Sequence, residues 1–152
     1  MSTFIPRTGC DAAPDIASIR KVIIMKPALF EHVNYTVTDP DRTAKMLEAI
    51  FGWHVRWAGA SMTNGRSVHV GTDDRYVALF SRGGTLARPS CYDSPGGLNH
   101  LGILVDDLDA AEQRVKDYGL TPESHQTYDP GSRFYFYDAD GIEYEVVSYA
   151  CA

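Results

Sequence analysis

The chain repeats itself, and this repeat constrains the fold more than any other feature of the sequence. Residues 30–53 (FEHVNYTVTDPDRTAKMLEAIFGW) align with residues 98–120 (LNHLGILVDDLDAAEQRVKDYGL), and the alignment places His32 on His100. In both segments an apolar strand pattern precedes an acidic turn and an amphipathic helix pattern. A repeat of this length indicates that one unit containing a strand and a helix is used twice.

The first unit opens with residues that alternate in polarity. His32, Asn34 and Thr36 alternate with Val33, Tyr35 and Val37. This period of two predicts a strand with a packed apolar face and an opposite face that is too polar to be a core. A helix follows, with Asp39 or Asp41 as its cap and Gly52 at its end. Strands are predicted at 54–58, 67–70 and 75–80, and the Asn64-Gly65 pair is typical of a hairpin turn.

The second unit follows the same order after a segment rich in Gly, Pro and Ser. The predicted elements are a strand at 98–105, a helix at about 108–118, and strands near 121–127, 132–138 and 143–149. We therefore predict an α+β fold made of two βαβββ modules. Its parts are an N-terminal arm (1–28) and a single domain (29–152), which divides into module one (29–80), a linker (81–97) and module two (98–152).

Composition excludes several classes of function. The net charge of −6 argues against nucleic acid as a partner, because phosphate binding needs clustered Lys and Arg. No apolar run approaches the about 20 residues of a membrane span, and residues 1–21 lack the apolar stretch of a signal peptide. Three cysteines without a CxxC pair do not predict a disulfide framework or a zinc site. We expect a cytoplasmic protein that acts on a small molecule.

The paired βαβββ modules and the ending FYFYDADGIEYEVV (134–147) resemble the vicinal-oxygen-chelate superfamily. Its members include glyoxalase I, methylmalonyl-CoA epimerase, fosfomycin-resistance transferases, bleomycin-binding proteins and extradiol dioxygenases. The resemblance covers residues 29–149 and implies a cupped mixed sheet around a metal site, with the helices outside. The family's ligand positions fall here on His32, His100 and Glu145. Glu143 shares a strand face with Glu145 and is the alternative carboxylate.

Two imidazoles and one carboxylate suit Fe(II), Mn(II), Ni(II) or Zn(II), and they leave positions for a substrate that chelates through two adjacent oxygens. Glyoxalase I has a fourth ligand, a glutamate, on the last strand of module one, and the epimerase has a glutamine there. The repeat offset from Glu145 lands near Val77, or at Leu79 with slip, and Tyr76–Phe80 contains no Glu, Gln, His or Asp. The resemblance implies a three-ligand set of this kind in extradiol dioxygenases and in fosfomycin transferases. Our first choice is an extradiol-type dioxygenase that uses Fe(II) and O2 on a catechol-like substrate.

Four further residues are candidates for the site. Tyr135 lies ten residues before Glu145, a spacing at which the resemblance implies a tyrosine that contacts substrate and takes part in catalysis. A core aromatic residue is the alternative for Tyr135. His125 is the candidate acid–base residue, because imidazole titrates near neutral pH, and a solvated loop histidine is its alternative. Asn34 and Tyr128 are predicted to line the substrate pocket.

Other functions of the family stay open. One is a non-redox metal-dependent isomerase, lyase or glutathione/thiol transferase, either glyoxalase-like or fosfomycin-resistance-like. The last of these needs cations around a phosphonate, for which Arg133 is the nearest residue. Another is a metal-free drug-binding protein. We expect a homodimer, because paired modules expose sheet edges and apolar surface, and the site can lie within one chain or between two.

Overall fold

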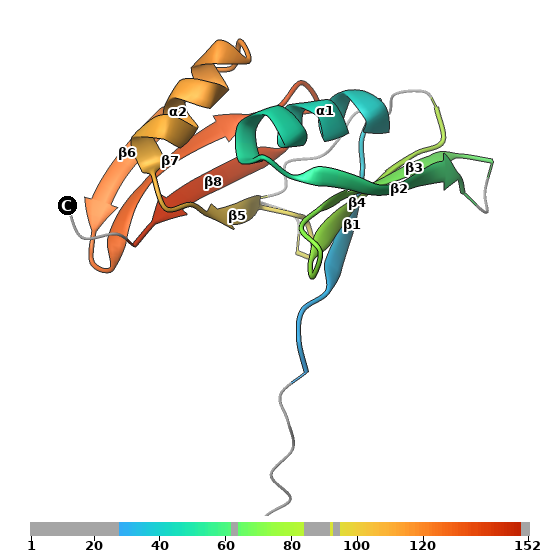
Figure 1. The fold of residues 1–152 in the computed structure, drawn as a ribbon, viewed down its shortest axis with the longest axis horizontal. Helices are drawn as coiled ribbons and strands as arrows, with labels where there is room; N and C mark the ends of the chain where they lie inside the picture. The colour runs from blue at the N-terminus through green and yellow to red at the C-terminus, as the bar shows by residue number, and fades with distance from the viewer. Residues whose placement is uncertain (1–27, 62–63, 84–91, 93–94, 150–152) are drawn as a thin grey trace, which may run out of the picture.

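The computed structural model describes residues 28–61, 64–83, 92 and 95–149. These residues form eight strands and two helices in two successive modules (Figure 1). The predicted N-terminal arm, except for residue 28, and most of the predicted linker lie outside the described residues. No helix in the described part of the chain is both long and apolar enough to span a membrane.

Module one contains one helix and one mixed sheet. Its elements are β1 (His32–Thr36), α1 (Pro40–Phe51), β2 (His54–Ala60), β3 (Arg66–Gly71) and β4 (Tyr76–Ser81). The strand order is β1-β4-β3-β2. β1 runs parallel to β4, and the other neighbours are antiparallel. The strands on each side of Asn64-Gly65 pair as the predicted hairpin.

Module two repeats this arrangement. Its elements are β5 (His100–Leu104), α2 (Leu108–Asp117), β6 (Glu123–Tyr128), β7 (Gly131–Tyr137) and β8 (Glu143–Ser148). The strand order is β5-β8-β7-β6, again with a parallel first pair. Two four-stranded mixed sheets, each with one helix, confirm the predicted α+β fold of paired βαβββ modules.

An aspartate caps each helix. In α1 the side chain of Asp39 accepts hydrogen bonds from the backbone N–H groups of Asp41 and Arg42, both at 3.1 Å. Asp107 accepts from the backbone of Ala110 at 2.8 Å in α2. These bonds satisfy donors that have no partner within the helix, so Asp39, not Asp41, is the cap. Gly52 ends α1 with a φ of 67°, a left-handed conformation that suits glycine.

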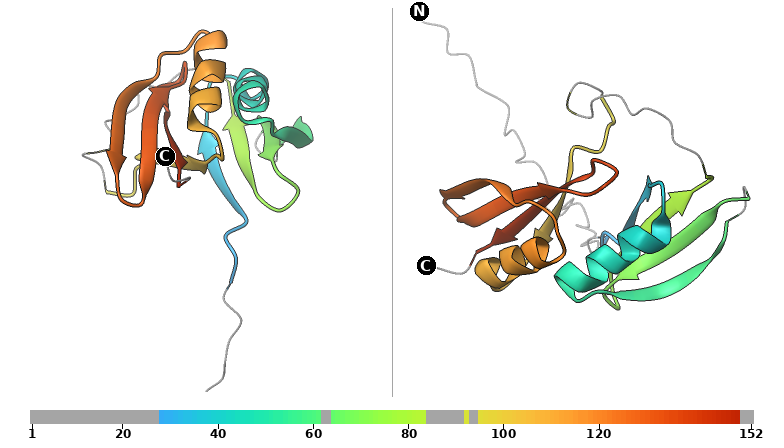
Figure 2. Two further views of the ribbon diagram at one scale, coloured as in Figure 1. Left: turned by 60° about the vertical axis from the view of Figure 1, so that its left-hand side comes forward. Right: turned by 90° about the horizontal axis from the view of Figure 1, so that it is seen from above.

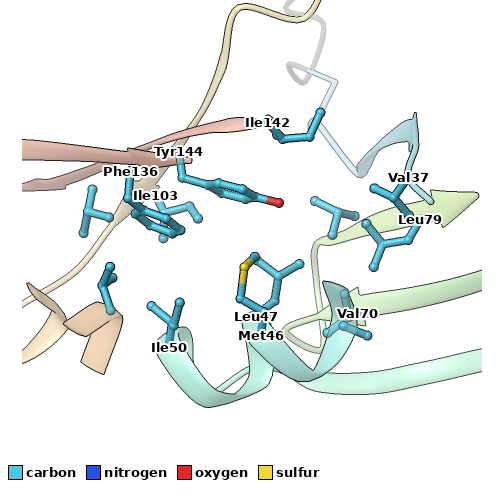
Figure 3. Packing of buried hydrophobic residues seen from close by; sticks show 14 of the residues in the cluster. Val37, Met46, Leu47, Ile50, Val70, Leu79, Ile103, Phe136, Ile142 and Tyr144 are labelled. Carbon is cyan, nitrogen blue, oxygen red and sulfur yellow. The ribbon is translucent and has the colours of Figure 1, made fainter. Parts of the chain in front are cut away.

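The two helices lie side by side on the same side of the two sheets (Figure 2). The core fills the space between helices and sheets and continues across both modules. Figure 3 shows Phe136 and Tyr144 of module two across from Leu47 and Ile50 of α1. The Tyr35 and Tyr144 hydroxyls are 3.0 Å apart, a hydrogen bond buried in this shared core.

A turn of module two also holds the end of β1. Thr38 donates from its backbone to Asp140 at 3.0 Å, and Arg42 lies 3.5 Å from the same carboxylate. Asp138, in the same turn, makes a bond within module two, because its carboxylate accepts a hydrogen bond from the backbone N–H of Ile142 at 2.9 Å. This turn thus joins module two to module one.

In both modules the helix and the core cover one side of the sheet. We call the other side of each sheet, which faces away from its helix, its open face.

Candidate functional site

The open face of module two brings two of the predicted metal ligands together. His100 projects from β5 and Glu145 from the adjacent strand β8, and His100 Nε2 lies 3.1 Å from Glu145 Oε2. Two ligand atoms that lie about 2.1 Å from a metal, at right angles to each other, are about 3.0 Å apart. The observed separation therefore fits neighbouring positions on one metal ion.

Three more side chains surround this pair. Arg133 Nη1 donates to the other oxygen of Glu145 at 2.9 Å. The Tyr135 ring meets the His100 ring edge-on, with centroids 6.1 Å apart. The Tyr128 ring stacks on the guanidinium of Arg133 at 4.0 Å. We call these five residues (His100, Tyr128, Arg133, Tyr135 and Glu145) the module-two half-site.

Tyr135 is protonated in this environment. Burial raises the pKa of its hydroxyl, and the charge of Glu145 and a hydrogen bond to that carboxylate raise the pKa further. A phenol with a raised pKa is a hydrogen-bond donor throughout the neutral range. Tyr135 can therefore donate a hydrogen bond to a negatively charged oxygen.

The third predicted ligand lies on the open face of module one. His32 Nδ1 is paired with the carboxylate of Glu31, so the other ring nitrogen, Nε2, is not used in this contact. The His32 ring stacks on Tyr76 with centroids 4.9 Å apart, and Tyr76 also stacks on His69 at 4.7 Å. The Trp57 ring lies 5.1 Å from that of His69. We call His32, Trp57, His69 and Tyr76 the module-one ring cluster.

Within one chain the three predicted ligands do not meet. Among the described residues, no group of three or more His, Cys, Asp or Glu side chains is placed to hold a metal ion. The side-chain partners of His32 belong to module one, and those of His100 belong to module two. A single chain therefore presents the predicted ligands in two separate places, one on each module.

The remaining candidates lie in different surroundings. Asn34 is exposed on the open face of β1. Glu143 is buried and accepts a hydrogen bond from Tyr92 at 2.5 Å, whereas Glu145 approaches His100. His125 Nε2 lies 3.2 Å from Glu112 of α2, on the helix side of the sheet. His125 therefore lies on the opposite side of the sheet from His100 and Glu145, and it does not lie beside them as was predicted.

The position of a fourth ligand in module one needs a correction of one residue. Glu145 pairs with Gly102 in module two, and the matching residue of β1, Asn34, pairs with Ala78. The counterpart of Glu145 is therefore Ala78. All three residues are buried, but Val77 and Leu79 belong to the hydrophobic core cluster and Ala78 does not. Since alanine cannot bind a metal, β4 supplies no ligand at this position.

Arg133 is the residue of this site that sequence reasoning underrated. It was considered only as the cation nearest to the metal ligands. It precedes Tyr135 by two positions on β7, and residues two apart on a strand share a face. That spacing was the signal that could have placed Arg133 beside Tyr135.

The paired βαβββ modules are also found in known proteins, and the sequence can be compared with theirs. The sequence model of the Glyoxalase/Bleomycin resistance protein/Dioxygenase superfamily matches residues 29–146. The chain belongs to this superfamily. Comparison with the curated proteins finds no match.

Solved structures of the same fold are similar over most of the chain. A glyoxylase/bleomycin resistance protein/dioxygenase domain from Frankia sp. EAN1pec is 25% identical, with a TM-score of 0.70, over 81% of this chain and 93% of that one. Fosfomycin resistance protein FosX from Mesorhizobium loti is 28% identical, with a TM-score of 0.61, over 81% and 92%. FosX from Listeria monocytogenes, complexed with Mn(II) and sulfate ion, is 18% identical, with a TM-score of 0.62, over 81% and 93%. At 18% identity, the similarity to the Listeria monocytogenes protein shows only that the two chains share a fold.

Proposed function

We propose that this protein is a metal-dependent enzyme that acts on a small molecule with two adjacent oxygens. The observation that carries the proposal is the 3.1 Å separation of His100 Nε2 and Glu145 Oε2, which suits two ligands of one ion. His32 is the third ligand. A divalent metal bound by these residues would supply Lewis-acid chemistry to the chelated oxygens.

In this proposal a second copy of the chain supplies His32. A two-fold dimer can place module one of each copy against module two of the other, which builds two equivalent sites. Exposed apolar side chains support such contact on both open faces. Leu104 and Tyr137 lie on the open face of module two, and Trp57 lies in the module-one ring cluster.

Mixing two inactive variants tests this arrangement. His32→Ala and His100→Ala each damage every site of their own homodimer. A mixed dimer would combine both lesions in one site and leave the other intact, so re-equilibrated mixtures should regain metal at about a quarter of the sites. Metal content measured after mixing, with each variant alone as the control, reads this directly. Mixtures that bind no more metal than the separate variants would place the complete site within one chain.

The first candidate chemistry is non-redox, as in fosfomycin-resistance proteins. Two observations favour it, namely the position of Arg133 beside Glu145 and the 28% identity to FosX from Mesorhizobium loti. Arg133 would bind an anionic group of the substrate, and Tyr135 would donate a hydrogen bond to an oxygen that gains charge. Turnover with Mn(II) under strict exclusion of O2 is the expected result.

The second candidate is extradiol ring cleavage with Fe(II) and O2. The observation that favours it is Ala78, because a site with only three protein ligands leaves room for a bidentate substrate and O2. O2 uptake by the Fe(II)-loaded protein with a panel of catechols tests this candidate. Uptake that is absent across the panel, together with anaerobic turnover with Mn(II), would leave the non-redox chemistry alone.

A further inference from the structure

A buried chain of hydrogen bonds links the two modules inside the shared core. The hydroxyls of Tyr35 on β1 and Tyr144 on β8 are 3.0 Å apart, and Tyr144 also donates to Asp138 Oδ2 at 3.3 Å. Because a hydroxyl has one hydrogen to donate, Tyr144 gives it to Asp138 and accepts from Tyr35. The other oxygen of Asp138 accepts from the backbone N–H groups of Asp140 and Ile142, both at 2.9 Å. The chain therefore runs from module one into a turn of module two.

The internal repeat indicates that these core positions do not need hydroxyl groups for packing. The repeat places Ile103 at the position of Tyr35 and Val77 at the position of Tyr144. All four side chains are buried, so aliphatic residues fill the equivalent positions of the same core. A buried hydroxyl loses its contact with water, and this loss must be compensated by a hydrogen bond. Polar chains that are satisfied in this way can fix one arrangement of a core.

Both tyrosines lie on strands that carry predicted metal ligands. Tyr35 follows His32 by three positions on β1, and Tyr144 directly precedes Glu145 on β8. Tyr144 also pairs across the sheet with the residue of β5 that follows His100. Neighbouring residues of a strand point to opposite faces, so the two hydroxyls lie behind the open faces. The angle between the modules of a chain therefore determines how the ligands are presented. This holds in a two-fold dimer as well, where each chain contributes to both sites.

We propose that Tyr35 and Tyr144 are positioning residues, whose hydrogen bonds hold the two modules at the angle that the three metal ligands need. This inference rests on the proposed function, and it applies to either chemistry and to a site within one chain or between two. Each tyrosine acts through the strand that carries a ligand and touches neither metal nor substrate. Without the hydrogen bonds, the arrangement that binds metal would be less populated, and the apparent affinity would fall by the same factor.

Removing one hydroxyl at a time tests the inference. Tyr35→Phe and Tyr144→Phe keep the buried rings, and each should weaken Mn(II) binding about two- to tenfold, the effect of one neutral hydrogen bond on an equilibrium. Dye competition at a fixed protein concentration measures the affinity. The double variant should bind Mn(II) as Tyr144→Phe does, because both changes break the same bond. The electron paramagnetic resonance spectrum of the bound Mn(II) should also change in the tyrosine variants, since it reports the geometry of the ligands.

Two control variants separate positioning from a general loss of stability. Val115→Ala removes part of a fully buried side chain from α2 and no hydrogen bond. It should lower stability in urea at least as much as either tyrosine variant, yet keep Mn(II) affinity and the Mn(II) spectrum of the wild type. Tyr118→Phe removes a hydroxyl from the exposed end of α2 and should change neither stability nor Mn(II) binding.

The outcomes separate this inference from the proposed function on which it rests. Tyrosine variants that lose stability but keep the Mn(II) affinity and spectrum of the wild type overturn the inference and leave the proposed function standing. An equal loss of Mn(II) affinity in Val115→Ala also overturns it, because any damage to the core would then weaken the site. A wild-type protein that binds no divalent metal overturns the proposed function and this inference with it.

Discussion

The two modules have the same topology but very different open faces. The face of module two carries a carboxylate, a guanidinium and an imidazole in direct contact, in Glu145, Arg133 and His100. The matching face of module one carries stacked rings around Tyr76, including that of His32. Each module keeps a histidine at the start of its first strand, but only module two has a carboxylate on the parallel neighbour.

This difference shows that two modules of the same topology can carry different parts of a predicted ligand set. One module alone presents one or two ligands, too few for the three-ligand site that the residues suggest. Module one offers flat aromatic surface instead of a second carboxylate. His69 supports this view, because burial, together with the nearby His32 and Arg56, lowers its pKa and favours its neutral ring. The predictions below test the core that the modules share and the separate contributions of each module, from the largest expected effect to the smallest.

The largest effect should come from breaking the core that the modules share. Phe136 is fully buried, stacks on Tyr144 at 5.0 Å and meets Phe51 of α1 at 6.2 Å. Phe136→Ala should lower the free energy of unfolding by about 3–5 kcal/mol, measured by urea denaturation. Tyr137→Ala, at the next and half-exposed position, is the control and should cost far less. Equal effects at the two positions would mean that the shared core contributes little.

Removing the histidine of module two should abolish tight metal binding. His100→Ala should weaken divalent-metal affinity by about a hundredfold or more, because even partners of metal ligands are worth about 10–100-fold. Competition with a metal-sensitive dye measures this. His69→Ala removes a histidine from the other open face and should change the affinity less than threefold. A comparable loss in His69→Ala would move the metal into the ring cluster of module one.

The two carboxylates of β8 should behave differently. Glu145→Gln keeps the size of the side chain but removes the charged ligand, and it should weaken metal binding at least tenfold. Glu143→Gln is the matched control two residues away and should leave metal affinity within threefold, because Glu143 is bonded to Tyr92. The reverse result would make Glu143, the alternative carboxylate, the ligand in place of Glu145.

The smallest effect concerns the ion pair between Asp41 of α1 and Arg66 of β3. The hydrogen bond from Arg66 lowers the pKa of Asp41 below its usual value. A lowered folded-state pKa adds stability above the unfolded pKa, and this stability is lost as pH falls through the folded value. Asp41→Asn should therefore reduce stability slightly at neutral pH and leave it unchanged well below pH 4. Both side chains are about half exposed, so the difference should be less than about 1 kcal/mol in urea titrations.

Sequence reasoning predicted the fold closely because repeat and alternation are local patterns. The alternation around Tyr35 identified the packed face of β1, and Asp39 or Asp41 at one end and Gly52 at the other marked the ends of α1. Burial of Tyr35 at 8% exposure and the left-handed Gly52 agree with both predictions. Such patterns depend on neighbouring residues, which the sequence shows directly.

The site was less predictable because it depends on faces and on contacts between strands. His125 and Tyr128 were both expected in the site, yet residues three apart on a regular strand point to opposite faces. The structure places Tyr128 on Arg133 and His125 toward α2, and the register of β6 also shifts between Glu123 and Gln126, where His125 lies. The repeat also could not show whether His32 meets His100 in the same chain, because equivalence in sequence carries no information about which copies pair.

The turn DADG (138–141) belongs to the segment whose resemblance to the superfamily implied a ligand at Glu145, but the turn itself does not take part in the half-site. Asp140 holds Thr38 at the end of β1, and Asp138 closes its own turn. The turn therefore indicates Glu145 only indirectly. It precedes β8, the strand that carries Glu145, and it joins that strand to module one. A homologue without the three predicted ligands could keep this turn for its role in packing, and one that changed Asp140 would need another residue to bind Thr38. Presence of the turn is thus evidence for the fold, and evidence for the chemistry must come from His100, Glu145 and Arg133.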